Sequence, residues 1–175
     1  MAKYPLAYVG QVLTADFVDS MIPDVYVKQA NETRTSTTTY ANDGELAGIP
    51  LGVGTWEVEF ILAMIGGGGG IAVKTQWSFT GTWNAPLRLV EGVTSGNTAA
   101  GTAAVSHQRS AYATNSDCVH GLSSSATYTL VREFSRQITV TVAGNLALSW
   151  APNVNSGSSG GVRQSSTCAV RQIGA

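Results

Sequence analysis

Charged side chains are scarce in this 175-residue sequence: they make up 12% of it, about half of the ~25% usual in soluble domains. Lysine and arginine nearly balance aspartate and glutamate, and the net charge is −1. Such a balance gives no electrostatic basis for binding nucleic acid or an anionic membrane. Because 43% of the residues are hydrophobic, a disordered chain is also excluded. The sequence predicts one folded domain, with neither nucleic acid nor membrane as a partner.

Long hydrophobic runs are missing as well. The N-terminus lacks the apolar segment of about 7 to 15 residues that a signal peptide needs. The best membrane candidate, residues 60–73, contains five consecutive glycines and is shorter than the ~20 residues of a spanning helix. A second charge-free stretch, residues 137–162, begins by alternating threonine with valine and isoleucine, as a strand does. We therefore expect a soluble protein synthesised in the cytoplasm.

Residues for metal binding and catalysis are few. Two cysteines and two histidines cannot supply the three or four paired ligands typical of a zinc site, and Gly66–Gly70 lacks the Lys-Ser/Thr of a phosphate-binding loop. Glu57 and Glu59 would lie about 7 Å apart on one strand face, a glycosidase-like spacing that is also common on solvent faces. We predict no catalytic residue, metal or cofactor, and no enzyme activity. Cys118 and Cys168 are expected as reduced thiols, with a disulfide as the open alternative.

Glycine, threonine and serine replace the missing charge, with 20, 19 and 17 residues respectively. Threonine favours strands, whereas glycine and serine favour turns, so the composition predicts an all-β fold. The clearest strand is Thr55–Ile65, in which alternate residues from Trp56 to Met64 are apolar. The next, Ile71–Thr80, repeats this period, and Gly66–Gly70 is expected to join the two as a hairpin loop.

The first 22 residues differ from the rest. An extended apolar arm precedes a short helix, Ala15–Ile22, which we expect to end at Pro23. An exposed apolar arm usually marks a surface for a partner, although the arm would equally well fold back on its own domain. The predicted partner-binding residues are Tyr4, Leu6, Tyr8, Val9, Leu13 and Phe17.

From residue 23 onward the sequence predicts about eight to ten strands separated by turns. Further runs with strand character are Val25–Lys28, Thr35–Tyr40, Val105–Ala113, Thr127–Phe134, Gln137–Ala143, Asn145–Trp150 and Cys168–Ile173. Gly92–Ala104 is expected to be a long loop. This number of strands suits a jelly-roll-like sandwich of two sheets over residues 23–175, with residues 1–22 as an arm and helix.

The strand segments resemble small structural proteins of tailed bacteriophages, especially those of actinobacterial hosts. The resemblance lies in VYVKQA at residue 25, TSTTT at 35, NDGEL at 42, GTWEVEF at 54, LALSWAPNV at 146 and VRQI at 170. It covers roughly residues 12–83 and 127–173. The final strands are also similar to those of tumour-necrosis-factor-like jelly rolls, which are usually trimers.

This resemblance implies a capsid decoration (minor capsid) protein on the virion surface, with the major capsid protein as its partner and a homotrimer as its assembly. A tail or fibre component is the alternative within the virion. A third reading, from another class, is a carbohydrate-binding module that presents Trp83 to a host-surface glycan. A surface poor in charge suits packing against many copies of a partner, because neutral polar groups are cheaper to desolvate than charges.

The strand Thr55–Ile65 predicts an oligomer interface. Its second face begins with glutamates and then becomes apolar at Ile61, Ala63 and Ile65, which gives it more hydrophobic surface than one sandwich interior accepts. Three covers are open: the N-terminal helix, the 92–104 loop or another subunit. We favour the subunit, because the helix is short and the loop is rich in small residues.

Overall fold

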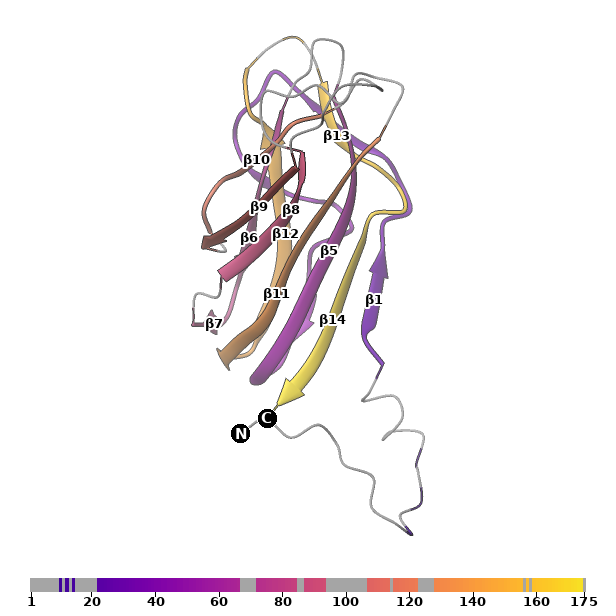
Figure 1. Cartoon of the computed structure of the whole chain (residues 1–175), viewed down its shortest axis with the longest axis vertical. Helices are drawn as coiled ribbons and strands as arrows, with labels where there is room; N and C mark the ends of the chain where they lie inside the picture. The colour runs from indigo at the N-terminus through magenta and orange to yellow at the C-terminus, as the bar shows by residue number, and fades with distance from the viewer. Residues whose placement is uncertain are drawn as a thin grey trace.

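The fold is a sandwich of two antiparallel β-sheets, which confirms the all-β prediction (Figure 1). The computed structural model describes residues 10, 12, 14, 22–66, 72–84, 87–93, 107–113, 115–122, 128–155, 157 and 159–174, with the backbone alone for 107–112. The described residues contain no helix. Of the helix expected at Ala15–Ile22, only Ile22 is described, and it lies in a bend.

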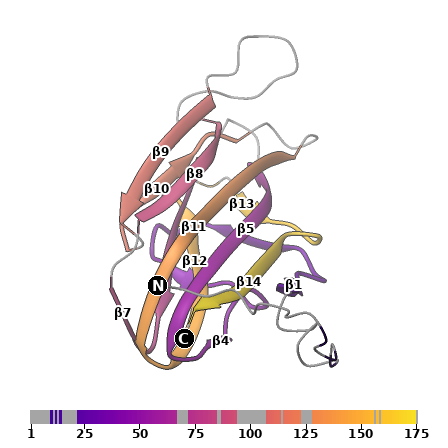
Figure 2. The same ribbon diagram turned by 60° about the horizontal axis from the view of Figure 1, so that its bottom comes forward.

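The first sheet carries the longest strands of the molecule, β5 and β11. Its main path runs β1-β14-β5-β11-β8-β9, with every pair antiparallel; β13 also pairs with β5 and β2, and β7 pairs with β11. Figure 2 shows the strands of this path in order across the sheet. The bounds are β1 Asp24–Val27, β2 Glu32–Thr35, β5 Gly54–Gly66, β7 Thr82–Trp83, β8 Leu87–Val93, β9 His107–Ala113, β11 Thr129–Val142, β13 Ser159–Val162 and β14 Thr167–Gly174.

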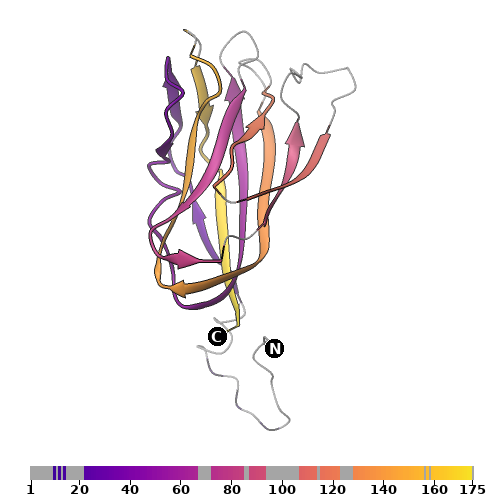
Figure 3. The ribbon, with the colours of Figure 1, turned by 90° about the vertical axis from the view of Figure 1, so that its left-hand side faces the viewer.

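The second sheet is smaller and has the order β10-β6-β12-β3, with β4 also paired to β12. Its strands are β3 Ala41–Asn42, β4 Ile49–Leu51, β6 Val73–Phe79, β10 Cys118–His120 and β12 Gly144–Pro152. Figure 3 shows the sandwich from the side, with the strands running mostly along the long axis of the molecule.

Apolar side chains from both sheets meet between the layers. Phe60 of β5 packs against Trp77 of β6 with ring centroids 5.2 Å apart, and Trp150 of β12 is completely buried. The predicted phase of β5 is confirmed, because Val58, Phe60, Leu62 and Met64 all point into this core. Burying each such side chain stabilises the fold by roughly 1.5–3 kcal/mol relative to exposure.

The hairpin expected at Gly66–Gly70 is wrong. The strands on either side of it, β5 and β6, belong to different sheets and share no backbone pairing. Both strands have one apolar face, and each buries that face against the core from its own layer of the sandwich. The glycine run therefore connects one sheet to the other.

Two strand predictions also change in detail. Thr35–Tyr40 is not a strand: β2 ends at Thr35, and pairing resumes only with β3 at Ala41. The strand expected near Val105–Ala113 exists as β9, which pairs with β8 through Val93 and His107. The predicted loop Gly92–Ala104 begins inside β8, and its residues 94–104 lie outside the described residues.

The chain also crosses from the first sheet to the second at Gly144, where β11 gives way to β12. A Cβ atom at Gly144 would lie 2.2 Å from the backbone nitrogen of Gly81, which belongs to the neighbouring β6–β7 turn. Only glycine allows these two turns to approach so closely. In the described part of the chain, no helix is long and apolar enough to cross a membrane.

Candidate functional site

The outer face of the first sheet, the side turned away from the second sheet, carries an unusual number of apolar side chains. We call it the outer face. It holds six of the twelve large apolar side chains that are exposed among the described residues: Val25, Val27, Ile61, Leu87, Leu89 and Leu130. Exposed apolar groups that gather on one face, rather than scatter singly, mark a surface for another molecule.

Strand register places these side chains in rows across the sheet. One row runs from Leu89 through Phe134, Glu59 and Ala169 to Val25. The next row holds Glu91, Arg132, Ile61, Thr167 and Val27. Each row crosses β8, β11, β5, β14 and β1, so the outer face is continuous over five strands.

Ion pairs link the strands of the outer face. Arg132 of β11 contacts Glu59 of β5 and lies 3.3 Å from Glu91 of β8, and this pairing raises the pKa of its guanidinium. Arg171 of β14 lies 2.5 Å from Glu57 of β5. Each of the two carboxylates in these rows, Glu59 and Glu91, therefore pairs with an arginine.

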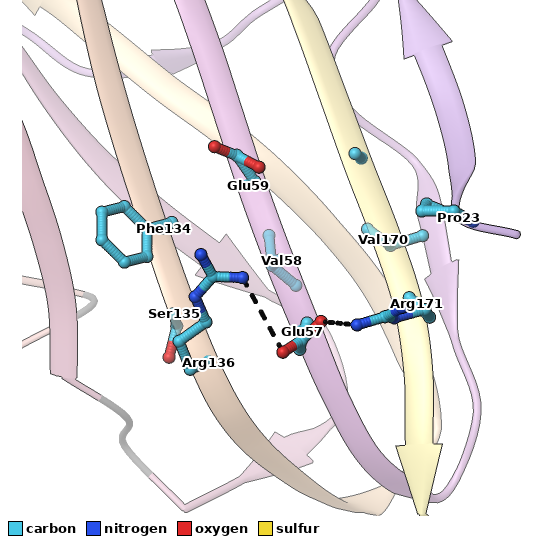
Figure 4. A pocket seen from close by; sticks show the side chains of 10 residues that line it. Pro23, Glu57, Val58, Glu59, Phe134, Ser135, Arg136, Val170 and Arg171 are labelled. Carbon is cyan, nitrogen blue, oxygen red and sulfur yellow. Dashed lines mark hydrogen bonds and ion pairs between the residues drawn. The ribbon is translucent and has the colours of Figure 1, made fainter. Parts of the chain in front are cut away.

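Arg136 forms a second ion pair with Glu57, with its Nη1 atom 3.8 Å from Glu57 Oε1 (Figure 4). Arg132 and Arg136 also lie over the ring of Phe134, 4.3 and 5.2 Å from its centroid. The ring thus holds both guanidinium groups against the sheet. Glu57 and Glu59, whose spacing on the strand is glycosidase-like, are each paired with arginine.

Two shallow hollows lie on the outer face. The first, of about 180 Å³, is lined by Pro23, Glu57, Phe134, Arg136, Ala169 and Arg171, among others (Figure 4). The second, of about 320 Å³, lies between Ile61, Leu130, Arg132 and Glu91. Both are open to solvent rather than enclosed, so they suit contact with a protein surface better than enclosure of a small molecule.

A charged cluster is buried between the sheets, and we call it the Glu133 cluster. Glu133 of β11 accepts hydrogen bonds from four donors: Arg88 Nη1 at 3.2 Å, Trp77 Nε1 at 2.8 Å, His120 Nε2 at 2.9 Å and the Thr75 hydroxyl. None of these five side chains is exposed by more than 1%. The cluster joins β8 and β11 of the first sheet to β6 and β10 of the second.

Electrostatics keep Glu133 ionised inside the protein. Burial alone would raise its pKa, but the charge of Arg88 and the hydrogen bonds from His120 and Thr75 outweigh burial and lower the pKa to about 2. The Nδ1 atom of His120 is buried without a hydrogen-bond partner in the described part of the chain. Because these side chains are at most 1% exposed, a substrate would reach the Glu133 cluster only if the sheets separated.

A second buried ion pair lies near the edge of the second sheet. Lys28 Nζ is 2.8 Å from Asp43 Oδ1, and Asp43 also accepts bonds from the backbone of Glu45 and Leu46 and from Trp150 Nε1. Burial favours the neutral acid, yet these donors lower the pKa of Asp43. The sequence analysis did not identify this contact, whose two residues are 15 positions apart in the chain.

The predicted interface residues differ in exposure. Ile61 is 44% exposed on the outer face, and Ala63 beside it is half-buried. Ile65 is only 6% exposed, because β13 pairs with β5 there and Gly161 lies opposite Ile65. Ile65 therefore has its cover within the chain, whereas Ile61 does not.

The predicted partner-binding residues Tyr4, Leu6, Tyr8, Val9, Leu13 and Phe17 lie outside the described residues. Trp83 is half-buried and stacks on Phe79 with centroids 4.8 Å apart, so one face of its ring is already used. Cys118 and Cys168 are buried thiols with no disulfide between them. Among the described residues, no group of three or more potential ligands is placed to hold a metal ion.

Comparison with protein-family models, with curated proteins and with solved structures finds no match to this chain. The case for a function therefore depends on the surfaces and clusters described above.

Proposed function

We propose that this chain is a non-enzymatic structural protein of a tailed-phage virion, which binds the capsid exterior as a decoration or minor capsid protein. The observation that carries the proposal is the outer face, a broad surface with six exposed apolar side chains, in which Glu57, Glu59 and Glu91 are each paired with arginine. A surface of this kind favours a large protein partner over a small substrate. The resemblance of its strand segments to phage virion proteins supplies the setting.

Strand order supports a jelly-roll topology for the domain. The first sheet places β1, β14, β5 and β11 side by side, and the second places β10, β6, β12 and β3 side by side. The chain thus alternates between layers, as at β5 to β6 and at β11 to β12. Two four-stranded layers connected in this way are the arrangement of a jelly roll, with the β8–β9 hairpin as an addition.

The proposed role is cementing. The protein is made in the host cytoplasm and then binds assembled capsids, with the major capsid protein as its partner and three copies at each site. Apolar residues of the arm, Tyr4 to Phe17, would be buried across adjacent capsid subunits, so that internal pressure would have to break these contacts as well. No cofactor takes part.

Imaging of purified virions tests the location. Density for this protein repeated symmetrically over the shell supports decoration. A few copies confined to the tail would refute it and identify a tail or fibre component instead.

Deletion of residues 2–12 tests the arm. We expect a folded domain that no longer binds capsids, because the core between the sheets is built from the strands that follow residue 23. A truncated protein that aggregates or unfolds would show that the arm belongs to the core, and the arm proposal would fail.

A glycan-binding module is the second candidate, because Trp83 of the short strand β7 is half-exposed. Its stacking on Phe79 leaves only one ring face for a sugar. Binding to a glycan array that is lost with Trp83→Ala would favour this function over decoration.

A further inference from the structure

We propose that strand β1 detaches from the sandwich while the rest of the domain stays folded, and that Lys28, the residue directly after β1, is the anchor at which this detachment stops. The inference deepens the proposed function, because an arm bound to a capsid would pull on β1 first. It rests on that function only for the use of the device. Detachment and anchor are properties of the free chain and are tested there.

Strand β1 is held to the domain from one side. It pairs with β14 through four residues, and among the described residues no strand pairs with its other edge (Figure 1). Val25 and Val27 are 58% and 46% exposed, and Tyr26 is the one half-buried residue of β1, packed against the core. An edge strand with so little buried apolar surface belongs to the least stable part of a fold.

The burial of the chain changes abruptly at Lys28. This residue is only 2% exposed, although Val27 before it is 46% exposed. The backbone nitrogen of Lys28 donates to the carbonyl of Ser166 at 2.8 Å, and the nitrogen of Ser165 donates to the carbonyl of Lys28 at 2.8 Å. The buried hydroxyl of Ser166 accepts a further bond from the nitrogen of Ala63 in β5. The backbone at Lys28 is thus connected through one turn to an inner strand of the first sheet.

The side chain of Lys28 connects the same point to the second sheet. Its Nζ atom lies 2.8 Å from Asp43 Oδ1, 3.3 Å from Glu32 Oε2 and 3.5 Å from Glu45 Oε2. Asp43 also accepts a hydrogen bond from the indole of Trp150, a completely buried residue of β12. Burial opposes the charged amine, yet the bonds with Asp43 and Glu32 raise the pKa of Lys28. One charged side chain therefore joins the N-terminal segment to the core.

The cost of opening rises sharply at this residue. Withdrawal of Lys28 would leave Asp43, whose side chain is fully buried, without its cation. Breaking a buried pair in this way costs much more than exposing the remainder of two valines that are already about half exposed. Directly after Lys28, the nitrogens of Gln29 and Ala30 also donate to the carboxylate of Glu45. Opening that begins at the arm should therefore pass through β1 and stop at Lys28.

The proposed function gives this device a use. The four residues of β1, at about 3.3 Å each, would add about 13 Å of free chain to the arm while the sandwich stays folded. Copies attached to a shell through their arms would then stay attached when the subunits beneath them are displaced by a similar distance.

Hydrogen exchange of single amides, measured by NMR on the free full-length chain, tests the inference. In the wild type we expect the hydrogen-bonded amides of β1 to exchange at least about tenfold faster than those of Lys28 and Ser165, and the amides of β5 and β11 to be the slowest. Lys28→Met removes the amine and keeps a long apolar side chain. The amides at position 28 and at Ser165 should then exchange as fast as those of β1, with β5 and β11 unchanged.

The matched control is Lys74→Met. It removes the lysine of another pair with an aspartate, in which Lys74 Nζ lies 3.8 Å from Asp117 Oδ2, and it lies in β6, away from β1. We expect the amides of β1, of Lys28 and of Ser165 to exchange as in the wild type. Equal loosening of β1 and its anchor by Lys74→Met would show that any lost ion pair has this effect, and Lys28 would not be the anchor.

A second variant covers the case in which Lys28→Met unfolds the domain by leaving Asp43 unpaired. Lys28→Met combined with Asp43→Asn removes both charges, so the sandwich should stay folded while the amides at position 28 and at Ser165 lose their protection. The inference is overturned if β1 exchanges as slowly as Lys28 in the wild type. It is also overturned if the double variant keeps the protection at position 28, or loses it in β5 and β11 as well.

The result is independent of capsid binding. A chain that shows fast exchange in β1 and an anchor at Lys28, yet never binds capsids, would reject the proposed function and retain this inference. A chain that binds capsids but exchanges evenly from β1 through Lys28 would reject the inference and retain the proposed function.

Discussion

Arg132 and Glu133 are consecutive residues of β11 whose side chains point to opposite sides of the sheet: Arg132 pairs with Glu59 and Glu91 on the outer face, and Glu133 is buried against Arg88 and His120. Because successive side chains of a strand point to opposite faces of the sheet, the exposed ion pairs and the buried cluster lie on opposite sides of β11. A single strand therefore carries both part of the outer face and the acid at the centre of the buried cluster between the two sheets.

Replacement of the buried carboxylate should be costly. Glu133→Gln removes the charge opposite Arg88, whose side chain is fully buried, and leaves that cation uncompensated. Breaking a buried pair in this way costs about 3–5 kcal/mol. We expect a loss of unfolding free energy of that size in urea titrations.

The exposed partner provides the control for that experiment. Glu91→Gln removes one carboxylate from Arg132 on the outer face, where both side chains are about one-third exposed. Its cost should stay below about 1 kcal/mol. Equal effects of the two substitutions would show that the Glu133 cluster is not a stabilising connection.

Acid should weaken the fold through the same carboxylate. The pKa of Glu133 is lowered to about 2, below the ordinary value of 4.5, so the ionised form is bound more tightly in the folded state. Its contribution is present above pH 4.5 and is lost as the pH falls toward 2. Asp43, whose pKa is also lowered, contributes with the same sign.

Urea midpoints measured from pH 7 down to pH 2 would detect this dependence. We expect the difference in unfolding free energy between the wild type and Glu133→Gln to be constant at neutral pH and to shrink between pH 4.5 and 2. If this difference were unchanged down to pH 2, Glu133 would not be the group whose lowered pKa makes the stability depend on pH.

Thiol reactivity should report on burial. Cys118 and Cys168 are both completely buried, and burial raises the pKa of the Cys168 thiol. Because the thiolate is the reactive form, neither group should react with a disulfide reagent in the folded protein. Two thiols per chain should react in denaturant without reductant; fewer would indicate oxidation.

Much of this fold follows from alternation along single strands. The inward phase of β5 is visible in the sequence because apolar residues from Val58 to Met64 recur with period two. Which strands neighbour each other is not visible in the sequence, and for that reason the glycine run after β5 suggests a hairpin that the structure does not contain. Pairing is decided by contacts between residues far apart in sequence, such as Gly161 beside Ile65.

The Glu133 cluster shows a similar limit and a missed signal. Arg88 and Glu133 are 45 residues apart, and nothing in the sequence places them together. However, each side chain lies at an alternating position of its strand that points into the core, two residues from a buried valine: Val90 for Arg88 and Val131 for Glu133. A charged side chain that points into the core requires a partner of opposite charge, so a buried arginine and a buried glutamate on two strands are candidates to pair with each other.

The tightest turn contact of the sandwich gives the last prediction. A Cβ atom at Gly144 would lie 2.2 Å from the nitrogen and 2.7 Å from the Cα of Gly81, and both of these are backbone atoms that have no alternative rotamer. Gly144→Ala should therefore move two turns apart and destabilise the protein by about 1–3 kcal/mol, as overpacked sites do. Gly157→Ala is the matched control, because a Cβ atom there meets nothing within 4 Å. Its effect on the thermal midpoint should be close to zero, and an equally small effect of Gly144→Ala would show that the two turns do not lie in contact.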